Sequence, residues 1–490
     1  MINVTTFLDA NSCRLNKPIY YNIDRNMKYN SRDILGIISY LGRKFLSLGI
    51  TKGDKVLIYL DNSPEYLFSF LALWRIGAVA VPTNRIYTIN ELEYFIQDSG
   101  AKLIIADQEI DELHINSYVI EELDEYVGEE ILEATNTSWD DLCQLQYTSG
   151  TTGKPKGAML THGNWFSAIQ NECDVLKMDY DSVMFCIYPM AHVGISWAIS
   201  ALRACALCIT KNKYTFDEYL DIIYENNVTH ATGMPPVIHS IVSSPEKVQN
   251  KLYSVKSMVS GGGPLHMDIW KKFYKKYGIP VLNAYGSSET IVIGTGTVIR
   301  PEDYYMADKF ESVGHPVCFS EIKIVDTEDY TKTLEKNEPG EIALRGPSIS
   351  LGYWNKEEAN KETFKEDGWF LTGDIGYLDE DNRLYITDRK KDMIIMSGWK
   401  IYPTEVEEIL ISYENVDEIA IFSLPDEHRG EIPVAAVIWR DVIDEEGLLE
   451  YANKKLARYK IPRKIFTVKS LPRVNNWKLL RRELKEQFQQ

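Results

Sequence analysis

The chain has 490 residues and a formal charge of −18, from 53 Lys and Arg against 71 Asp and Glu. This length predicts two to four domains with a large core, and a composition that is 44% hydrophobic and 25% charged excludes the disordered and fibrous classes. The acidic balance argues against nucleic acid or an anionic membrane as partner, but it allows a basic pocket for a small anion.

The first third of the chain predicts alternating helices and strands. Apolar residues recur at helical spacing over Ser31–Leu48 and again over Tyr66–Ile76. The short apolar runs Lys55–Leu60, Val79–Pro82 and Leu103–Ala106 predict buried strands. This rhythm is typical of βαβ units with a mainly parallel sheet.

The same rhythm returns further along the chain. Lys213–Asn226 and Leu265–Tyr277 predict helices, and Ser257–Ser260 and Val281–Ala284 predict strands. Near Gly340 the pattern changes to short strands joined by tight turns, which predicts antiparallel structure. These strands are Glu341–Arg345, Tyr377–Asp379 and Arg383–Thr387.

The last hundred residues predict a separate small α+β region. Thr404 and Glu407 have the spacing of a capping box at the start of a helix. Ile419–Ser423 and Val434–Trp439 predict two strands, and Asp444–Ala457 predicts a further helix.

We therefore predict the α/β class with two domains. Residues 1–390 would form a large N-terminal domain of βαβ subdomains plus an antiparallel portion. Residues 391–490 would form the small C-terminal α+β domain, with the boundary in the charged run Asp388–Asp392.

Membrane segments and disulfides are not expected. The longest apolar run, Leu67–Pro82, is interrupted by Arg75, and the N-terminus lacks the pattern of a secretory signal. The seven cysteines are odd in number and suit a reducing compartment, so we expect a cytoplasmic protein. Cys205 and Cys208 form an isolated CxxC within an apolar run, which predicts core packing rather than a zinc site.

The strongest local signal is YTSGTTGKPKG at Tyr147–Gly157. It combines four Ser and Thr hydroxyls with three glycines and two lysines. Glycines let backbone N–H groups turn toward an anion, the hydroxyls add donors and a lysine adds charge, so the pattern predicts a phosphate site. It is not a Walker A loop, because Thr148 stands where the first glycine belongs and Pro155 follows the lysine.

YTSGTTGKPKG resembles the signature of the adenylate-forming superfamily, which includes acyl-CoA synthetases, luciferases and nonribosomal adenylation domains. Further motifs of this family occur in the same order along the chain. They are SGGGPL at Ser260–Leu265, YGSSE at Tyr285–Glu289, TGD at Thr372–Asp374, DR at Asp388–Arg389 and YPTEVE at Tyr402–Glu407.

The resemblance implies an ATP site. Tyr285 would stack on the adenine, Asp374 would accept the ribose hydroxyls, and Arg389 would donate to the ribose. The residues predicted to bind ATP or AMP are Thr148, Ser149, Gly150, Thr151, Thr152, Gly153, Lys156, Gly262, Gly263, Pro264, Asn283, Ala284, Tyr285, Gly286, Ser288, Asp374, Arg389 and Lys478.

The resemblance also implies catalytic and acyl-binding residues. Lys478, His192 and Glu289 would be catalytic, and Glu289 with Thr151 would hold Mg²⁺ on the ATP phosphates. Trp477 stands where the family usually has glycine before this lysine. The predicted acyl pocket comprises His192, Val193, Gly194, Trp197, Gly286 and Ser287.

The implied reaction has two halves that share one pocket. A carboxylate attacks the α-phosphorus of ATP, and a thiol of CoA or of a carrier-protein phosphopantetheine then attacks the acyl adenylate. The small domain would rotate about Lys391 between the halves. It would present Lys478 first and then a thiol channel at Gly398, Trp399 and Lys400.

The substrate is open at this point. Gly368–Leu410 is similar to medium- and long-chain fatty acid ligases, so a fatty acid is the first expectation. An aryl acid, or loading of an acyl carrier protein, are the alternatives within the enzyme class. A non-catalytic nucleotide-binding protein is suggested only by the altered loop around Trp477.

Overall fold

A computed structural model describes most of the chain: residues 3–12, 17–121, 123, 130–148, 155–244, 246–261, 265, 267–300, 302–304, 312–474 and 478–489. The chain divides into two compact units. Unit 1 comprises Met1–Ile322 and Leu344–Phe370, and unit 2 comprises Lys323–Ala343 and Leu371–Gln490.

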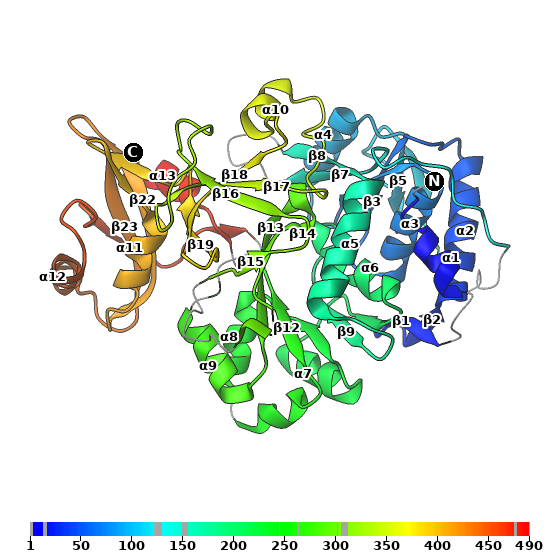
Figure 1. The fold of residues 1–490 in the computed structure, drawn as a ribbon, viewed down its shortest axis with the longest axis horizontal. Coiled ribbons are helices and arrows are strands. Elements are labelled where there is room, and N and C mark those ends of the chain that lie inside the picture. The colour runs from blue at the N-terminus through cyan, green and yellow to red at the C-terminus, as the bar shows by residue number, and fades with distance from the viewer. Residues whose placement is uncertain are drawn as a thin grey trace. The chain divides into compact units, whose positions relative to one another are not determined.

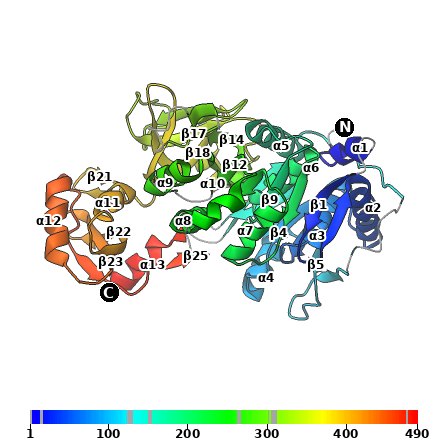
Figure 2. The same ribbon diagram turned by 90° about the horizontal axis from the view of Figure 1, so that it is seen from below.

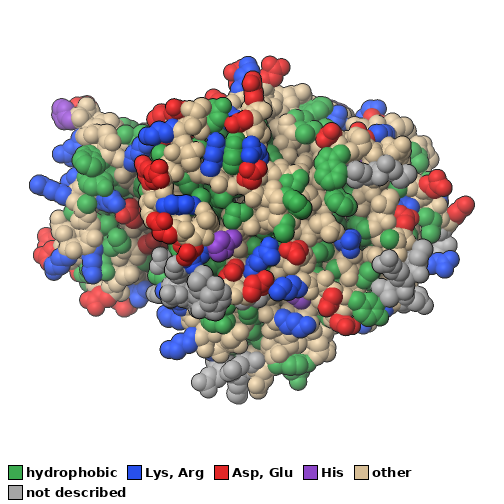
Figure 3. All heavy atoms as spheres, viewed as in Figure 1, with side chains coloured by type: hydrophobic (Ala, Val, Ile, Leu, Met, Phe, Trp, Pro, Cys, Tyr) green, Lys and Arg blue, Asp and Glu red, His purple; other side chains and the backbone are tan. Residues whose placement is uncertain are grey.

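The helices and the surface charge can be compared with what a membrane or nucleic-acid partner would require. No helix in the described part of the chain is both long and apolar enough to cross a bilayer. Acidic and basic side chains are mixed over the face that Figure 3 shows, rather than sorted into a stripe of one sign.

Unit 1 contains a six-stranded sheet in the order β6-β5-β3-β4-β7-β8. Its strands are β3 (Lys55–Tyr59), β4 (Val79–Thr83), β5 (Leu103–Ala106), β6 (Asn116–Val119), β7 (Leu142–Thr148) and β8 (Lys156–Thr161). The pairing is parallel except between β7 and β8, which are antiparallel. Successive side chains of a strand point to opposite faces, so Val56 and Ile58 enter one core and Leu57 and Tyr59 another. Burial on both faces explains the unbroken apolar run of this strand.

The second sheet of unit 1 has nine strands in the order β15-β14-β13-β12-β11-β9-β10-β1-β2. Their bounds are β1 (Pro18–Asn22), β2 (Met27–Asn30), β9 (Val183–Cys186), β10 (Leu207–Thr210), β11 (His230–Thr232), β12 (Ser257–Ser260), β13 (Val281–Ser287), β14 (Val292–Val298) and β15 (His315–Pro316). Its central strands are parallel, and β2, β14 and β15 pair antiparallel.

Helices cover both sheets of unit 1 (Figures 1 and 2). A core shared by the two sheets includes α2 (Ser31–Ser47), α3 (Pro64–Arg75), α5 (His162–Leu176) and α6 (Ser196–Arg203). The six-stranded sheet packs its other face on α4 (Ile89–Ser99). The nine-stranded sheet packs its other face on α7 (Phe216–Glu225), α8 (Pro235–Ser243) and α9 (Met267–Tyr277). Short helices α1 (Thr6–Ser12) and α10 (Glu357–Thr363) complete this unit.

Unit 2 has its own core. Most of a four-stranded sheet lies here, ordered β16 (Glu321–Val325), β17 (Gly340–Arg345), β18 (Phe370–Leu378) and β19 (Leu384–Arg389), of which β18 and β19 pair antiparallel. A second sheet combines β20 (Ile394–Met396), β21 (Trp399–Ile401), β22 (Val416–Asp426), β23 (Gly430–Trp439) and β24 (Ile465–Thr467). Helices α11 (Pro403–Leu410), α12 (Glu445–Lys455) and α13 (Arg481–Phe488) pack around the β22–β23 hairpin (Figure 2). A short ribbon joins β25 (Arg473–Val474) to β26 (Lys478–Leu479).

The predicted α/β class, with a large and a small part, is confirmed. Cys208 is fully buried and Cys205 packs against the same core, as the apolar context predicted. The predicted capping box of Thr404 and Glu407 is wrong. Helix α11 begins at Pro403 after Tyr402, which makes no side-chain cap. The Thr404 N–H donates to Asp388 Oδ2 at 2.8 Å, and Glu407 binds Arg481 rather than the helix start.

Candidate functional site

The strands β7 and β8 hold the two ends of the predicted phosphate loop. Thr148 pairs with Lys156 across the hairpin, and the Thr148 hydroxyl donates to the Lys156 carbonyl at 3.4 Å. The loop between these ends is not part of the described chain, so these predicted contacts lie outside it: Ser149, Gly150, Thr151, Thr152 and Gly153.

Helix α4 anchors both ends of this hairpin. The Tyr147 hydroxyl donates to Asp98 Oδ2 at 2.8 Å, and the Tyr94 hydroxyl donates to the Pro155 carbonyl at 2.7 Å. Lys356 Nζ lies 2.6 Å from Asp98 Oδ1 and neutralises this carboxylate. Burial and the Asp98 carboxylate raise the pKa of Tyr147, so this phenol stays a hydrogen-bond donor.

Strand β13 carries Asn283, Ala284, Tyr285 and Gly286, and it is crossed closely by β14. A Cβ on Gly286 would lie only 1.6 Å from the Val292 carbonyl oxygen, so glycine is required there. The ladder is irregular between Tyr285 and Ser287, which turns the strand end. Of the predicted adenine turn, Gly262, Gly263 and Pro264 lie outside the described residues.

Glu289 lies in a single 3₁₀ turn, Ser288–Thr290, directly after β13. The Ser287 hydroxyl accepts the Glu289 N–H at 3.2 Å, and the Thr290 hydroxyl accepts the Ser287 N–H at 2.9 Å. The buried Glu289 carboxylate accepts a hydrogen bond from the Tyr353 hydroxyl, with Oε1 2.8 Å away.

This donor set fits the implied Mg²⁺. Among the described residues, no three His, Cys, Asp or Glu side chains gather in a metal-holding group. Mg²⁺ is usually held by one or two carboxylates together with substrate phosphates rather than by a full protein cage. A single buried carboxylate at Glu289 therefore suits a metal that arrives on ATP.

The predicted acyl segment is held by two side chains that the sequence did not single out. Asn62 donates to the Tyr188 carbonyl at 3.1 Å and accepts the Met190 N–H at 2.8 Å. Gln146 Nε2 donates to the Ala191 carbonyl at 3.1 Å. The next residue, His192, begins the 3₁₀ turn Val193–Ile195.

Helix α6 follows this turn and supplies Trp197, which is 2% exposed. A Cβ on Gly194 would lie 2.8 Å from Tyr188 Cβ, so the turn packs closely on that ring. The carboxyl group of Glu172 on α5 accepts the hydroxyls of Ser196 and Ser200 at 2.5 and 2.6 Å. Burial raises the pKa of Glu172 to about 8.

In unit 2, the predicted ribose residues lie opposite each other. Asp374 on β18 pairs in register with Arg389 on β19, and Arg389 Nε lies 2.7 Å from Asp374 Oδ1. The neighbouring Lys390 Nζ lies 2.7 Å from the buried Glu341 carboxylate. The structure thus brings both predicted ribose contacts together on one hairpin.

The predicted thiol channel is a tight turn between β20 and β21. Ser397 and Gly398 both have positive φ, 52° and 84°, as a two-residue type I′ turn requires. Trp399 is 58% exposed and stacks on Tyr459 with ring centroids 4.8 Å apart. Lys400 Nζ donates to the Thr327 hydroxyl at 2.6 Å.

Lys478 begins β26, where its backbone pairs with Val474. For Lys478 the structure describes the backbone, and Trp477 lies outside the described residues. Three residues on, Arg481 Nη2 binds both Glu407 oxygens at 2.8 and 2.7 Å. Arg481 Nε also donates to the Ile421 carbonyl at 3.0 Å. This anchor fixes the backbone that carries Lys478.

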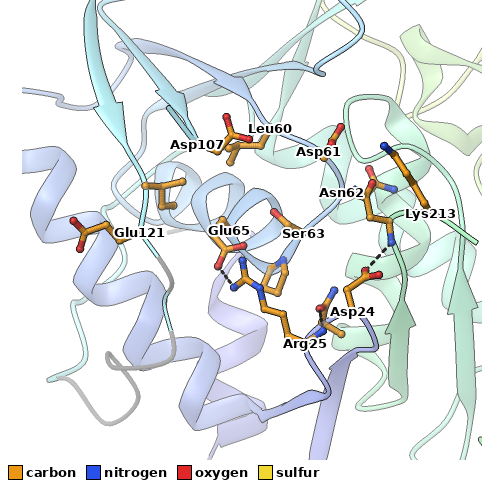
Figure 4. Close-up of a pocket in the computed structure, with 14 residues that line it drawn as sticks. Asp24, Arg25, Leu60, Asp61, Asn62, Ser63, Glu65, Asp107, Glu121 and Lys213 are labelled. Atoms are coloured by element: carbon orange, nitrogen blue, oxygen red, sulfur yellow. Dashed lines mark hydrogen bonds and ion pairs between the residues drawn. The ribbon is translucent and has the colours of Figure 1, made fainter. Parts of the chain in front are cut away.

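A cavity of about 450 Å³ lies elsewhere in unit 1 (Figure 4). It opens at the carboxyl ends of β3 and β5 and contains none of the predicted site residues. Arg25 and Glu65 form an ion pair within it, and the Asn212 N–H donates to Asp24 at 2.8 Å. Asn62, which holds the acyl segment, also lines it.

Family models match both parts of the chain. The "AMP-binding enzyme" model matches residues 9–354, and the "AMP-binding enzyme C-terminal domain" model matches residues 405–478. The chain is 32% identical to "4-coumarate--CoA ligase 3" from Oryza sativa subsp. japonica, covering 89% of this chain and 83% of that protein. It is 33% identical to "2-succinylbenzoate--CoA ligase" from Bacillus cytotoxicus, covering 90% and 89%.

The chain also resembles solved structures over nearly all its length. One is the o-succinylbenzoate CoA synthetase of Bacillus subtilis with its acyl-adenylate intermediate. The TM-score is 0.86 and the identity 28%, with 98% of each chain covered. The same enzyme in complex with ATP and a magnesium ion gives a TM-score of 0.85 at 28% identity, covering 98% of this chain and 99% of that one.

Proposed function

Because the chain belongs to the AMP-binding enzyme family and is an acid–thiol ligase, we propose that it converts an aryl carboxylic acid to its CoA thioester. ATP activates the acid as an acyl adenylate, and CoA then displaces AMP. The observation that carries this proposal is the match over about nine-tenths of the chain to coumarate and succinylbenzoate CoA ligases.

These relatives support an aryl acid better than the medium- or long-chain fatty acid that the sequence first suggested. The segment at His192 supports the same choice, because the buried Trp197 and the Tyr188 ring against Gly194 give it aromatic surroundings. Aromatic side chains favour a planar ring by stacking or edge contacts.

In the first half-reaction the acid's carboxylate attacks the α-phosphorus and pyrophosphate leaves. Lys478 would donate to the oxygens on which negative charge develops, and the hydroxyls and N–H groups of the loop after Thr148 would bind phosphate oxygens. Glu289 would orient the metal-bound triphosphate. Mg²⁺, when bound, neutralises phosphate charge and orients the pyrophosphate leaving group. Tyr285 would stack on the adenine, and Asp374 and Arg389 would hold the ribose hydroxyls.

In the second half-reaction the thiol sulfur attacks the acyl carbonyl carbon, and the bond to the AMP oxygen breaks. His192 would border the reacting carbonyl. The turn at Gly398 would admit the thiol arm close to the backbone, since glycine carries no side chain. Rotation of the small domain about Lys391 would exchange the two sets of residues.

An acid-dependent ATP–pyrophosphate exchange assay tests this proposal. The panel would contain coumarate, benzoate, succinylbenzoate, octanoate and palmitate. Aryl acids should give exchange at least tenfold faster than the alkanoates. Faster exchange with the alkanoates would favour a fatty acid as the substrate. If no acid of the panel supported exchange, the proposal that the enzyme activates one of these acids would be contradicted.

Two further predictions concern the acceptor and the location. CoA should accept the acyl group at least tenfold faster than a carrier-protein phosphopantetheine, as measured by thioester formation from the purified acyl adenylate. The cytoplasmic location remains a prediction, which fractionation of the producing cells would check.

A further inference from the structure

A short segment of unit 1, residues 350–354, connects the strand that follows the predicted phosphate loop to the predicted metal ligand. The Trp354 N–H donates to the Gly157 carbonyl at 2.8 Å, and the Met159 N–H donates to the Gly352 carbonyl at 2.8 Å. At the other end of the segment, the Ser350 N–H donates to the Glu289 carbonyl at 2.7 Å. The backbone of this segment therefore bridges β8 and the turn that carries Glu289.

Tyr353, in the middle of the segment, makes the same connection with its side chain. Its hydroxyl donates to Glu289 Oε1 at 2.8 Å. Lys156 Nζ lies over the face of its ring, 5.1 Å from the centroid. One buried side chain thus contacts both the loop lysine and the predicted metal ligand.

Neighbouring side chains contact both the backbone and the ring of Tyr353. Asn360 accepts the Tyr353 N–H at 2.6 Å and donates to its carbonyl at 2.9 Å. Phe364 packs edge-on at a centroid distance of 5.3 Å. The ring therefore has few alternative rotamers, and its hydroxyl is presented to Glu289 in one place.

We propose that Tyr353 is a positioning residue that fixes the Glu289 carboxylate for Mg²⁺ and holds the Lys156 ammonium beside it. The inference rests on the proposed function, in which Glu289 binds the metal on ATP. With Oε1 engaged by the phenol, Oε2 has no hydrogen-bond partner among the described residues and is left to face the metal. A hydrogen bond to one oxygen restricts rotation about the last torsion of the Glu289 side chain. A carboxylate without this bond would lose the same rotational freedom only when the metal binds.

Tyr353→Phe separates the hydroxyl from the ring. Phenylalanine keeps the packing on Phe364 and the aromatic face under Lys156, but it removes the donor to Glu289. We expect the Mn²⁺ concentration for half-maximal binding, titrated with α,β-methylene-ATP present, to rise about five- to tenfold. Binding of this analogue in EDTA should stay within twofold of wild type, which also reports that the site is folded.

Tyr277→Phe is the matched control, because the Tyr277 hydroxyl donates to the Ile241 carbonyl at 2.9 Å elsewhere in unit 1. It should leave the Mn²⁺ titration unchanged. In the exchange assay, Tyr353→Phe should need a higher Mg²⁺ concentration and regain most of its rate at saturating Mg²⁺.

Glu289→Gln distinguishes the inference from the function on which it rests. A weakened Mn²⁺ titration with both Glu289→Gln and Tyr353→Phe supports the positioning role. A loss with Glu289→Gln but a wild-type titration with Tyr353→Phe overturns only the role of Tyr353. A wild-type titration with Glu289→Gln overturns the metal assignment and the positioning role with it.

Discussion

Lys478 stands three residues before Arg481, and the Glu407 carboxylate holds that arginine in the core of unit 2. Lys478→Ala should lower acid-dependent ATP–pyrophosphate exchange by roughly a hundredfold or more, since one preorganised donor to a charged transition state contributes about 3–4 kcal/mol. Thioester formation from supplied acyl adenylate should stay within a few-fold of wild type, because the proposed rotation about Lys391 replaces Lys478 with the Gly398 turn before that step.

A surface lysine provides the control for this change. Lys469 is exposed in the same unit, and Lys469→Ala removes the same charge without affecting either half-reaction. If Lys478→Ala slows both half-reactions equally, the role assigned to this lysine is contradicted.

A sequence motif can single out an individual residue for a site. A residue whose role depends on a contact far away in the chain cannot be found in this way. The TGD and DR motifs identified Asp374 and Arg389, and the strand register brings these two side chains together. Tyr353 was not identified, because its partner Glu289 is 64 residues away in the chain. Asn62 was missed for the same reason, since it holds Met190 across 128 residues.

At the scale of secondary-structure elements, the β20–β21 hairpin gives a specific expectation. Gly398 has φ 84°, where other residues are strained, and open space surrounds the position of a Cβ. Gly398→Leu should slow thioester formation at least tenfold more than adenylate formation, because the leucine side chain would occupy the proposed thiol path.

Gly398→Ala is the control for backbone strain. Alanine and leucine are both strained at this positive φ, but the alanine side chain is much smaller. Both half-reactions should be measured for the two variants. If Gly398→Leu forms thioester at the rate of Gly398→Ala, the channel assignment fails.

The contact between α5 and α6 predicts a pH-dependent stability. The Glu172 pKa is about 8 in the fold, against 4.5 as its ordinary value, because burial disfavours the charged form. The folded state therefore binds a proton that the unfolded state releases. This stabilisation is complete below about pH 4.5 and is lost as the pH rises toward 8, by roughly 3 kcal/mol at pH 7.

Glu172→Gln removes this titration and keeps groups that can hydrogen-bond to Ser196 and Ser200. Its Tm should approach that of wild type near pH 5 and exceed it increasingly toward about pH 8.5, measured by thermal unfolding. Glu225→Gln, at an exposed position, should show no such trend. A Tm difference for Glu172→Gln that does not grow with pH would argue against a buried neutral carboxyl.

Most elements were predictable because apolar periodicity survives in each. The runs Leu103–Ala106 and Ser257–Ser260 coincide with β5 and β12. The first is apolar throughout, as strands buried on both faces usually are. The capping box of α11 was wrongly predicted, because Glu407 has the local spacing of a capping residue but binds Arg481, 74 residues away, and the Thr404 N–H donates to Asp388. Local spacing cannot reveal a competing long-range ion pair.

At the scale of the whole molecule, the hinge predicted at Lys391 need not coincide with a boundary between the two compact units. The hinge is a point about which the small domain would rotate, whereas the units are defined by packing. Unit 2 includes Lys323–Ala343, which precedes the predicted hinge by many residues. Lys390 is tied to this segment through Glu341, so the backbone just before Lys391 is held within unit 2. The family match at residues 405–478 begins after the hinge, and rotation about Lys391 therefore remains a prediction to be tested directly.

Lys391→Pro tests rotation at this position. Proline fixes φ near −65° and restricts the residue before it, so a pivot at Lys391 would be arrested in whichever arrangement proline favours. One half-reaction should then fall at least tenfold more than the other, and complete CoA-ester synthesis should fall with the slower one. Lys391→Ala removes the same side chain but leaves φ variable, so it should keep both rates within a few-fold. Parallel losses in Lys391→Pro, or none, would place the pivot elsewhere in the chain.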